Sequence, residues 1–263
     1  MDAVYPSELS DAEWQVVERL LPAPKPRGRK LEIGWRRILD GIFYVNKEGC
    51  QWRALPKEFG KWQSFYHYFR LWRIDGTWQR VNDALRRLER KAQGRKAEPS
   101  VGIMDSQSAK TTAKKGPRGY DAGKKICGRK RHLMVDTQGL VLTALVHPAD
   151  IQDRDGAKLL IEQMKCTLPR LRTVFADGGY AGQLVDWFWD SVRWNLEIVK
   201  RTATAGFQLL PKRWIVERTF AWLSQYRRHS RDYEELPETS EAMIYVSMIR
   251  LMLRRAGKRK ANA

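Results

Sequence analysis

The chain has 263 residues, of which 43% are hydrophobic and 11% aromatic, so it can bury a substantial core and is not a disordered chain. Its 49 Lys and Arg residues outnumber 30 Asp and Glu residues, and the resulting net charge of +19 points to a polyanionic partner. No apolar run is long enough to cross a membrane, and the first residues lack the pattern of a secretory signal. We therefore expect a soluble, intracellular protein.

Residues 9 to about 92 have the apolar periodicity of helices. Ser10, with Glu13 three residues later, forms the S-x-x-E signature of a helix N-terminus. After the Pro-rich and basic connector 22–30, further helices follow, and Thr77 is the expected N-cap of the last one. The expected helices are residues 11–21, 35–46, 64–72 and 78–91.

The last two expected helices are joined by a glycine-containing turn and are rich in Trp, Tyr, Arg and Lys. This combination suits a helix-turn-helix element. A plain helical bundle with an aromatic core explains the same pattern equally well, because two helices joined by a turn often have no role in DNA binding. Both interpretations stay open for residues 1–95, which we expect to form a helical DNA-binding domain.

A polar linker, residues 91–99, precedes a region with the pattern of strands. Strands are expected at 101–104, 172–176 and 196–199, with a hairpin over 132–146 around a Thr-Gln-Gly turn. Helices are expected at 153–168, 183–193, 214–226 and 239–254, the last ending in a basic tail to Lys260. This order predicts an α/β domain with a mixed sheet over residues 100–263.

Three acidic residues stand out in this second domain. Asp105 and Asp177 each follow a short apolar run, so each is expected at the carboxyl end of a buried strand, and Glu217 lies on an amphipathic helix. If the two strands are parallel neighbours, both aspartates emerge at the sheet edge where α/β proteins bind ligands. Taken singly, each acid is explained as well by a turn, a cap or an ion pair with a neighbour. Asp136, which heads a turn, is a poor candidate for a ligand.

A carboxylate set of this kind suits hard divalent cations. Cys50, Cys127 and Cys166 are far apart and the four histidines form no close pair in the sequence, which argues against a disulfide framework or a zinc ribbon. Mg²⁺ or Mn²⁺ held by oxygen is the expected metal. Two such ions can activate the attacking oxygen and stabilise the leaving oxygen of a phosphodiester. We expect Asp105 to bridge the ions, with Asp177 and Glu217 completing one ion each and Gly178 and Gly179 leaving room for the metal.

Two basic features accompany the acids. Residues 110–131 contain nine Lys or Arg residues against one acid, Asp121, and this segment is expected to follow phosphates. On the helix of Glu217, the positions of Arg213, Ser224 and Arg228 fall on the same face. Such a face can admit a metal and a DNA backbone, although an Arg213–Glu217 pair on a solvated helix gives the same spacing.

At these residues the chain resembles bacterial insertion-sequence transposases of the IS5 group, within the IS4-like DDE superfamily. The resemblance covers almost the whole length, and its combination of motifs is specific although no single motif is. The motifs are Leu9-Ser-Asp-Ala-Glu-Trp14, Gly28-Arg-Lys30, Gly49-Cys-Gln-Trp-Arg53-Ala-Leu-Pro56, Trp62 to Trp72, Asp105-Ser-Gln-Ser108, Gly128-Arg-Lys-Arg-His132-Leu-Met-Val-Asp136-Thr-Gln-Gly139, Ala176-Asp177-Gly-Gly-Tyr180 and Val216-Glu217-Arg-Thr-Phe220.

The resemblance implies an RNase H-like catalytic core whose DDE triad is Asp105, Asp177 and Glu217. It also implies binding to double-stranded DNA at terminal inverted repeats, cleavage and strand transfer through 3′-hydroxyl ends with two Mg²⁺ ions for which Mn²⁺ substitutes, and a location in the bacterial cytoplasm with the nucleoid. Because two element ends react together, a dimer or larger assembly on DNA is expected. Arg129, Lys130, Arg131, His132, Arg213 and Arg228 are the expected DNA contacts.

The chain departs from the wider family at one signature, Tyr-x₂-Arg-x₃-Glu-x₆-Lys. Arg213 and Glu217 are kept, but Leu210 replaces the Tyr and Ser224 the Lys, whose role Arg227 or Arg228 could fill. Two other functions remain open: a metal-dependent nuclease without strand transfer, and a DNA-binding regulator in which the acids are incidental. Joining of a 3′-hydroxyl donor to a target separates the first from a transposase, and insensitivity to loss of Asp105 identifies the second.

Overall fold

The computed structural model describes residues 5–23, 33–164, 167–199 and 212–261, and within it the chain divides into two compact units. One unit holds residues 1–95, 225–230 and 242–263; the other holds 96–224 and 231–241. The sequence predicts a continuous second domain over 100–263, whereas in the structure 225–230 and 242–263 cluster with the N-terminal helices. The motif at Gly28 and the position of Leu210 lie outside the described residues.

The helical unit contains the helices that the sequence predicts, but the first is shorter, because α1 (Asp11–Val17) ends before a 3₁₀ turn, and the others are longer. Ser10 accepts a hydrogen bond from the Glu13 backbone N–H at 3.3 Å, and the Glu13 carboxylate accepts one from the Ser10 N–H at 2.9 Å, so the predicted capping box is present. The predicted basic tail is instead helical, because the last helix continues to Ala261. The elements are α1 Asp11–Val17, η1 Glu18–Leu20, α2 Trp35–Glu48, η2 Trp52–Ala54, η3 Lys57–Phe59, α3 Trp62–Ile74, α4 Thr77–Ala92, η5 Arg227–His229 and α8 Pro237–Ala261.

Aromatic side chains form much of the core of this unit. Phe65, Phe69 and Trp72 on α3 and Trp78 on α4 are at most 2% exposed. The Trp78 indole N–H donates to the Phe69 carbonyl at 3.1 Å, so α3 and α4 are also joined by a hydrogen bond. These aromatic residues therefore have the core role that the bundle interpretation assigned to them.

A tight turn joins α3 to α4. Gly76 has φ +73°, a left-handed conformation that a residue with a Cβ rarely adopts. The Asp75 carboxylate accepts hydrogen bonds from the Thr77 N–H at 2.9 Å and the Thr77 hydroxyl at 2.6 Å, which fixes the start of α4. Asp75 thus performs the capping role that the sequence suggested for Thr77.

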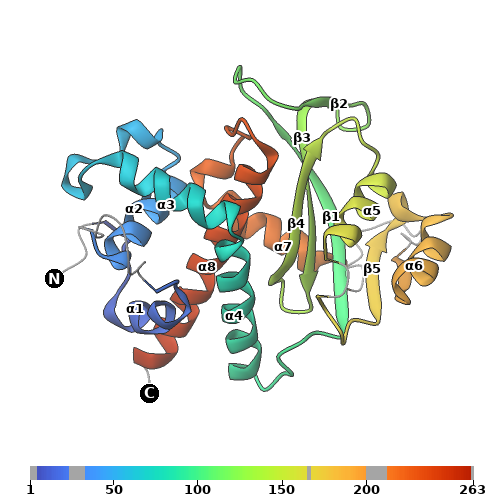
Figure 1. Ribbon diagram of the computed structural model, residues 1–263. Coiled ribbons are helices and arrows are strands. Elements are labelled where there is room, and N and C mark those ends of the chain that lie inside the picture. The colour runs from blue at the N-terminus through green and yellow to red at the C-terminus, as the bar shows by residue number, and fades with distance from the viewer. Residues whose placement is uncertain (1–4, 24–32, 165–166, 200–211, 262–263) are drawn as a thin grey trace, which may run out of the picture. The chain divides into compact units, whose positions relative to one another are not determined.

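The second unit is built on one mixed sheet (Figure 1). Its central strand β1 (Val101–Lys110) pairs antiparallel with β3 (Ile126–Asp136) and parallel with β5 (Thr173–Asp177). The far edge of β3 pairs with β2 (Gly119–Asp121) and β4 (Val141–Pro148), and β5 pairs parallel with β6 (Asn195–Val199). The predicted hairpin and the predicted parallel neighbours are both present, and this is the RNase H-like mixed-sheet fold that the resemblance implied.

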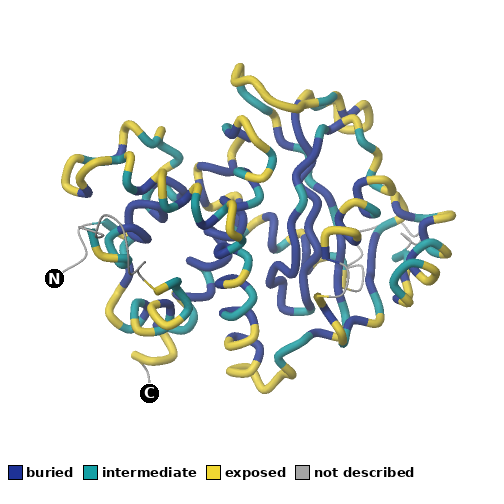
Figure 2. The backbone as a smooth tube through the Cα atoms, viewed as in Figure 1, coloured by how far each residue is buried: buried dark blue, intermediate teal, exposed yellow. Residues whose placement is uncertain are grey.

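Helices cover the two faces of this sheet. On one face, apolar residues of α5 (Asp153–Met164) and α6 (Leu184–Val192) pack in a buried cluster with Met104 and Met134 of the sheet. Residues of a strand alternate between faces, so Ile103, Asp105 and Phe175 point to the opposite face. There α7 (Arg213–Ser224) contacts β1, β3 and β5, and the strands between the two layers are buried (Figure 2). We call the two sides the α5 face and the α7 face.

The predicted position of Asp105 at a strand end is wrong. β1 continues to Lys110, paired with β3 as far as Gly128. Its pairing with β5 stops at Ile103↔Phe175, so Asp105 lies mid-strand on an edge that β5 no longer covers. Residues 105–110 are mostly polar and carry no hydrophobic signal, which is why the sequence pattern ended the strand too early.

No helix in the described ranges is long and apolar enough to cross a bilayer.

Candidate active site

The structure brings Asp105 and Asp177 together on the α7 face. Asp177 is the last residue of β5, as predicted, and both aspartates lie two positions beyond the last β1–β5 pair. They line the same small cleft with Phe175 and with Arg213 from the start of α7. Parallel pairing therefore delivers two carboxylates to one point, where α7 adds its first turn.

Asp105 is held by its own strand. Its Oδ1 accepts a hydrogen bond from the Ser106 backbone N–H at 2.7 Å. Burial, followed by the nearby charge of Asp177, raises its pKa to about 6, although the Ser106 N–H, Arg213 and Lys124 act in the opposite direction. A carboxylate with this pKa is one whose negative charge lacks compensation, and a bound cation would supply it.

Asp177 is held by the turn that follows β5. Its Oδ1 accepts a hydrogen bond from the Gly179 N–H at 2.9 Å at the start of η4 (Gly178–Tyr180). An ideal Cβ built at Gly179 would lie 3.1 Å from that oxygen, whereas one at Gly178 would meet nothing within 4 Å. Close approach to the carboxylate therefore explains Gly179 but not Gly178.

Arg213 lies between Asp177 and Glu217 and contacts both. Its Nη2 is 3.5 Å from Asp177 Oδ2, and its Nε is 3.1 Å from Glu217 Oε1. The Glu217 side chain is 53% exposed, against 27% for Asp177. The guanidinium thus joins the β5 acid to the α7 acid, and Glu217 is turned toward Arg213 in this conformation.

The donor chemistry of the site fits Mg²⁺ or Mn²⁺, because its ligands are carboxylate oxygens and its acids crowd negative charge. Its geometry is incomplete, since among the described residues no three acidic, His or Cys side chains stand close enough to hold an ion. Asp105 and Asp177 are the pair that would hold the metal, and Glu217 would join when released from Arg213.

The expected DNA contacts on β3 are corrected by their burial. Arg129, Lys130, Arg131 and His132 are 1%, 6%, 3% and 0% exposed. Their side chains bond to protein groups, among them the carbonyls of Pro117, Glu234 and Glu235 for Arg129, Ile151 for Lys130 and Arg231 for Arg131. Groups engaged in this way present no surface to a phosphate backbone. They hold the sheet together instead.

The predicted face of α7 also ends early. The helix stops at Ser224, whose hydroxyl donates to the Ala221 carbonyl at 2.8 Å. Arg228 belongs to η5 in the helical unit, is 7% exposed and donates to the Cys50 carbonyl at 2.8 Å. Of the predicted face, Arg213, Glu217 and Ser224 remain on α7, and only Arg228 leaves it.

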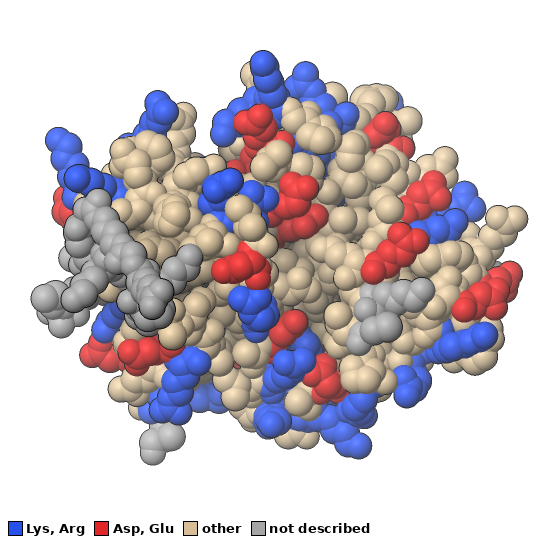
Figure 3. Space-filling model, viewed as in Figure 1, with Lys and Arg blue, Asp and Glu red and all other residues tan. Residues whose placement is uncertain are grey.

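The basic segment 110–131 is nevertheless largely at the surface. Figure 3 shows Lys and Arg side chains gathered around the β2 end of the sheet unit. Six of the nine basic residues of the segment are exposed: Lys110, Lys114, Lys115, Arg118, Lys124 and Lys125.

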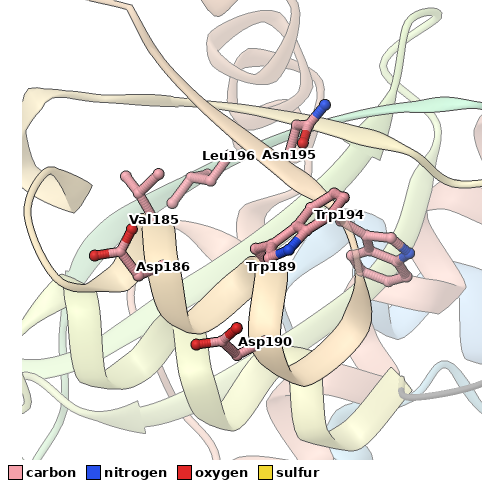
Figure 4. Close-up of a pocket in the computed structure, with 7 residues that line it drawn as sticks. All are labelled: Val185, Asp186, Trp189, Asp190, Trp194, Asn195 and Leu196. Atoms are coloured by element: carbon pink, nitrogen blue, oxygen red, sulfur yellow. The ribbon is translucent and has the colours of Figure 1, made fainter.

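A hollow of about 560 Å³ lies on α6 and β6 (Figure 4) and shares no residue with the carboxylate cleft. Trp189 and Trp194 line it together with Asp186 and Asp190. Two carboxylates beside indole rings repel phosphate, so this hollow is not the candidate site for a nucleic acid.

The sequence did not single out Asp153, which lies behind Asp105. Ser106, Asp153, Tyr180 and Lys130 meet on the α5 face, where the Ser106 hydroxyl donates to Asp153 Oδ1 at 2.8 Å. Asp136, in contrast, is the turn residue that the sequence indicated. Its carboxylate accepts hydrogen bonds from the N–H groups of the turn, those of Gln138 and Leu140.

Family models match both parts of the chain. Residues 96–252 match the model described as "Transposase DDE domain", and residues 9–82 match the one described as "Putative transposase of IS4/5 family".

Two proteins of Burkholderia cepacia are similar to parts of the chain. The "Putative transposase for insertion sequence element IS402" is 33% identical over 127 residues, which are 44% of this chain and 57% of that protein. The "Insertion element IS402 uncharacterized 16.2 kDa protein" is 39% identical over 83 residues, which are 29% of this chain and 56% of that protein. The chain thus spans little more than half the length of these relatives.

Among solved structures, the "Crystal structure of the Mos1 mariner paired end complex with Mn" aligns over 91% of this chain and 82% of its own. Its TM-score of 0.25 and identity of 11% are too low to support a conclusion. The DDE-domain match, in contrast, spans all three acids and more than half of the 263 residues. The chain therefore belongs to the DDE transposases of the IS4/5 type.

Proposed function

We propose that this protein is the transposase of a bacterial insertion sequence, and that it cleaves DNA at the element's inverted repeats and joins the freed 3′-hydroxyl ends to target DNA. The observation that carries the proposal is the placement of Asp105 and Asp177 side by side on the α7 face, within a segment that matches the DDE domain. The proposed reaction places the protein in the bacterial cytoplasm, on the nucleoid, as a dimer or larger assembly.

The chain's own residues have separate tasks in this reaction. Asp105 and Asp177 would hold divalent cations and Glu217 would complete the set, with Mg²⁺ or Mn²⁺ activating the attacking oxygen and stabilising the leaving one. In the absence of DNA, the Arg213 guanidinium contacts the carboxylates of both Asp177 and Glu217. Because its guanidinium can form two parallel hydrogen bonds to a phosphate, we propose that DNA draws Arg213 away from Glu217 and frees that carboxylate.

Two exposed surfaces are proposed to bind the DNA. On α3, the exposed residues Gln63, Tyr66, His67 and Arg70 fall on one face, opposite the buried Phe65 and Phe69. Gln and Arg are the side chains that read base edges by paired hydrogen bonds. The exposed lysines and arginine of segment 110–125 are suited to phosphates, and they take over the role predicted for Arg129 to His132.

The test uses the full chain, a duplex carrying the inverted repeat found beside its gene, and a plasmid target. Wild-type protein with Mg²⁺ is expected to nick the duplex at the repeat and to join its 3′ end to the plasmid. Asp105→Asn is expected to bind the duplex as the wild type does but to do neither reaction. Asp155→Asn is the matched control, since this residue is 64% exposed on α5 and paired only with Lys158 in the described structure.

The other outcomes identify the alternatives. Cleavage without joined products would make the protein a nuclease. Binding without Mg²⁺-dependent cleavage would make it a DNA-binding regulator, and cleavage that survives Asp105→Asn would overturn the assigned site.

The α3 surface has its own test. Arg70→Ala is expected to weaken binding to the repeat and to lower the slope of log affinity against log salt by about one if Arg70 neutralises a phosphate, or to relax base preference if it reads a base. Arg87→Ala on α4, also an exposed arginine, is the comparison. Equal effects of the two variants would exclude the α3 face.

A further inference from the structure

A polar network, buried except for the partly exposed Asp153, lies behind the proposed catalytic aspartate, on the opposite face of the same strand. Strand alternation puts Ser106 on the α5 face while its neighbour Asp105 points to the α7 face. The Ser106 side chain, in a residue 8% exposed, donates to Asp153 Oδ1 at 2.8 Å, and the Lys130 ammonium lies 3.1 Å from the same oxygen. The Ser106 N–H donates to Asp105 Oδ1 at 2.7 Å. One residue therefore connects Asp153 to Asp105.

This connection matters because β1 is weakly supported there. Pairing with β5 ends at Ile103, so from Met104 onward no strand of the described residues lies beside that edge of β1. On its other edge β3 continues the ladder, and the Asp153 contact adds a side-chain anchor at Ser106. The Lys124 ammonium adds contacts to the Ser106 carbonyl at 3.3 Å and to its hydroxyl at 3.5 Å. The orientation of the Ser106 N–H, and through it of the Asp105 carboxylate, thus depends on the partners of the Ser106 side chain.

The position of Asp153 is itself fixed by close packing of α5. Three residues later on the same helix face, an ideal Cβ built at Gly156 would lie 2.5 Å from His147 Nε2 and 2.7 Å from His132 Nδ1. Only a glycine lets the helix come this close to the two rings. The start of α5, with Asp153, is thereby set against β1.

The two histidines form a hydrogen-bond chain with one direction. His147 Nδ1 lies 2.9 Å from the Pro148 carbonyl, which only accepts, so this nitrogen carries the proton. In a neutral ring its Nε2 then accepts from His132 Nδ1 at 3.1 Å, and His132 Nε2 accepts from the Tyr180 hydroxyl at 2.6 Å. Tyr180 in turn lies against the Ser106 hydroxyl. The two histidine rings and the Tyr180 hydroxyl are therefore joined by hydrogen bonds beside α5 and Ser106.

We propose that Asp153 is a positioning residue for Asp105, acting through Ser106, and that it sets the geometry in which Asp105 holds a divalent cation. Asp153 is not assigned as a ligand, because its Oδ1 is shared by the Ser106 hydroxyl and the Lys130 ammonium. The cleavage part of its test rests on the proposed function, whereas the metal-binding part does not.

The experiment measures Mn²⁺ affinity by titration calorimetry on the full chain without DNA. The variants are Ser106→Ala, Asp153→Asn and the double variant, with Asp155→Asn as the control and thermal unfolding recorded for each. Loss of an outer partner of a metal ligand costs about 10- to 100-fold in metal affinity. We expect each single variant to weaken the Asp105-dependent Mn²⁺ site by about tenfold, and the double variant to be no weaker than the weaker single variant, because both remove the same link.

Two results would overturn the positioning role. Unchanged Mn²⁺ affinity together with a lower unfolding temperature would mean that the network only stabilises the fold. Weakened binding in Asp153→Asn but not in Ser106→Ala would mean that Asp153 is itself a ligand.

The parallel cleavage assay separates failure of this proposal from failure of the proposed function. The variants are expected to need about tenfold more Mg²⁺ for half-maximal cleavage and to bind DNA normally. Wild-type protein that binds Mn²⁺ through Asp105 but never cleaves DNA contradicts the proposed function alone. Wild-type protein without an Asp105-dependent Mn²⁺ site contradicts the positioning role as well.

Discussion

The two faces of β1 at residues 105 and 106 differ in how completely their polar groups are satisfied. On the α5 face, the buried Ser106 and Lys130 both contact Asp153, whose side chain is 30% exposed, and the buried histidines bond to each other and to Tyr180. On the α7 face, Asp105 and Asp177 crowd negative charge, and Glu217 forms a partly exposed ion pair with Arg213. The polar groups of the α5 face are therefore held in place by one another. The α7 face lacks positive charge to balance its carboxylates, as a site that binds cations requires.

The largest expected effect comes from neutralising Asp105. Asp105→Asn is expected to lower the cleavage rate by about 10⁴-fold or more, as removal of a principal catalytic group does.

The same substitution should make the folded protein more stable. The folded-state pKa of about 6 lies above the ordinary value of 3.8, so the ionised form opposes folding at pH 7. Removing the charge should raise the free energy of unfolding by about 1–3 kcal/mol, measured by urea unfolding at pH 7 without metal. A destabilised variant would contradict the account of an uncompensated charge.

The second effect tests the α5 face. Gly156→Ala should lower the free energy of unfolding by about 1–3 kcal/mol, because its methyl group overlaps the His132 and His147 rings. Since α5 must then shift, the Mn²⁺ affinity of the α7 face should fall as well. Lys158→Ala, farther along α5 and 43% exposed in its side chain, is the control for loss of side-chain contacts on the helix. A stable Gly156→Ala variant with wild-type affinity would break the link between the faces.

Acid should weaken the α5 face. Burial and the neighbouring His147 lower the pKa of His132 to about 3, against an ordinary value of 6.5, and burial lowers the pKa of His147 too. The unfolded chain therefore takes up protons that the folded chain excludes, and stability is lost as the pH falls below about 6.5. Each excluded proton contributes about 1.4 kcal/mol per pH unit. In His132→Gln the slope of unfolding free energy between pH 6 and pH 4 should be smaller, whereas His67→Gln, on the exposed face of α3, should keep the wild-type slope.

The smallest effect on stability is expected at Arg213. Its ion pairs are partly exposed, so Arg213→Gln should change the free energy of unfolding by less than about 1 kcal/mol. Cleavage should nevertheless fall, and DNA affinity with it, if Arg213 moves to a phosphate. A large loss of stability with normal cleavage would make Arg213 a structural residue.

Much of the fold could be predicted from local patterns. The capping box at Ser10 and the hairpin around Asp136 depend on short-range signals, and both are present. The strands before Asp105 and Asp177 also have local apolar signals, and their parallel pairing follows from the helix that connects the hairpin to the second strand. The length of β1 could not be predicted, because its second half is polar and is held by pairing with β3. The return of residues 242–261 to the helical unit is a long-range arrangement without a local signal.

The same limit applies to the site. Asp105, Asp177 and Glu217 stand out through motif and charge, and Arg213 through its spacing from Glu217. The run of positive residues at Arg129 to Arg131 suggested DNA contact, because sequence shows charge but not the carbonyls that accept its hydrogen bonds. Asp153 went unnoticed for the opposite reason: it opens an ordinary helix, and its partners Ser106 and Lys130 lie 47 and 23 residues away in the sequence.

The most direct test of the central claim, that Asp105 and Asp177 hold a divalent cation on the α7 face, is the titration of the metal-free full chain with Mn²⁺. The wild type and Asp155→Asn should bind Mn²⁺ alike, while Asp105→Asn and Asp177→Asn should each lose the site yet remain folded. Binding that is unchanged in both aspartate variants would contradict the claim.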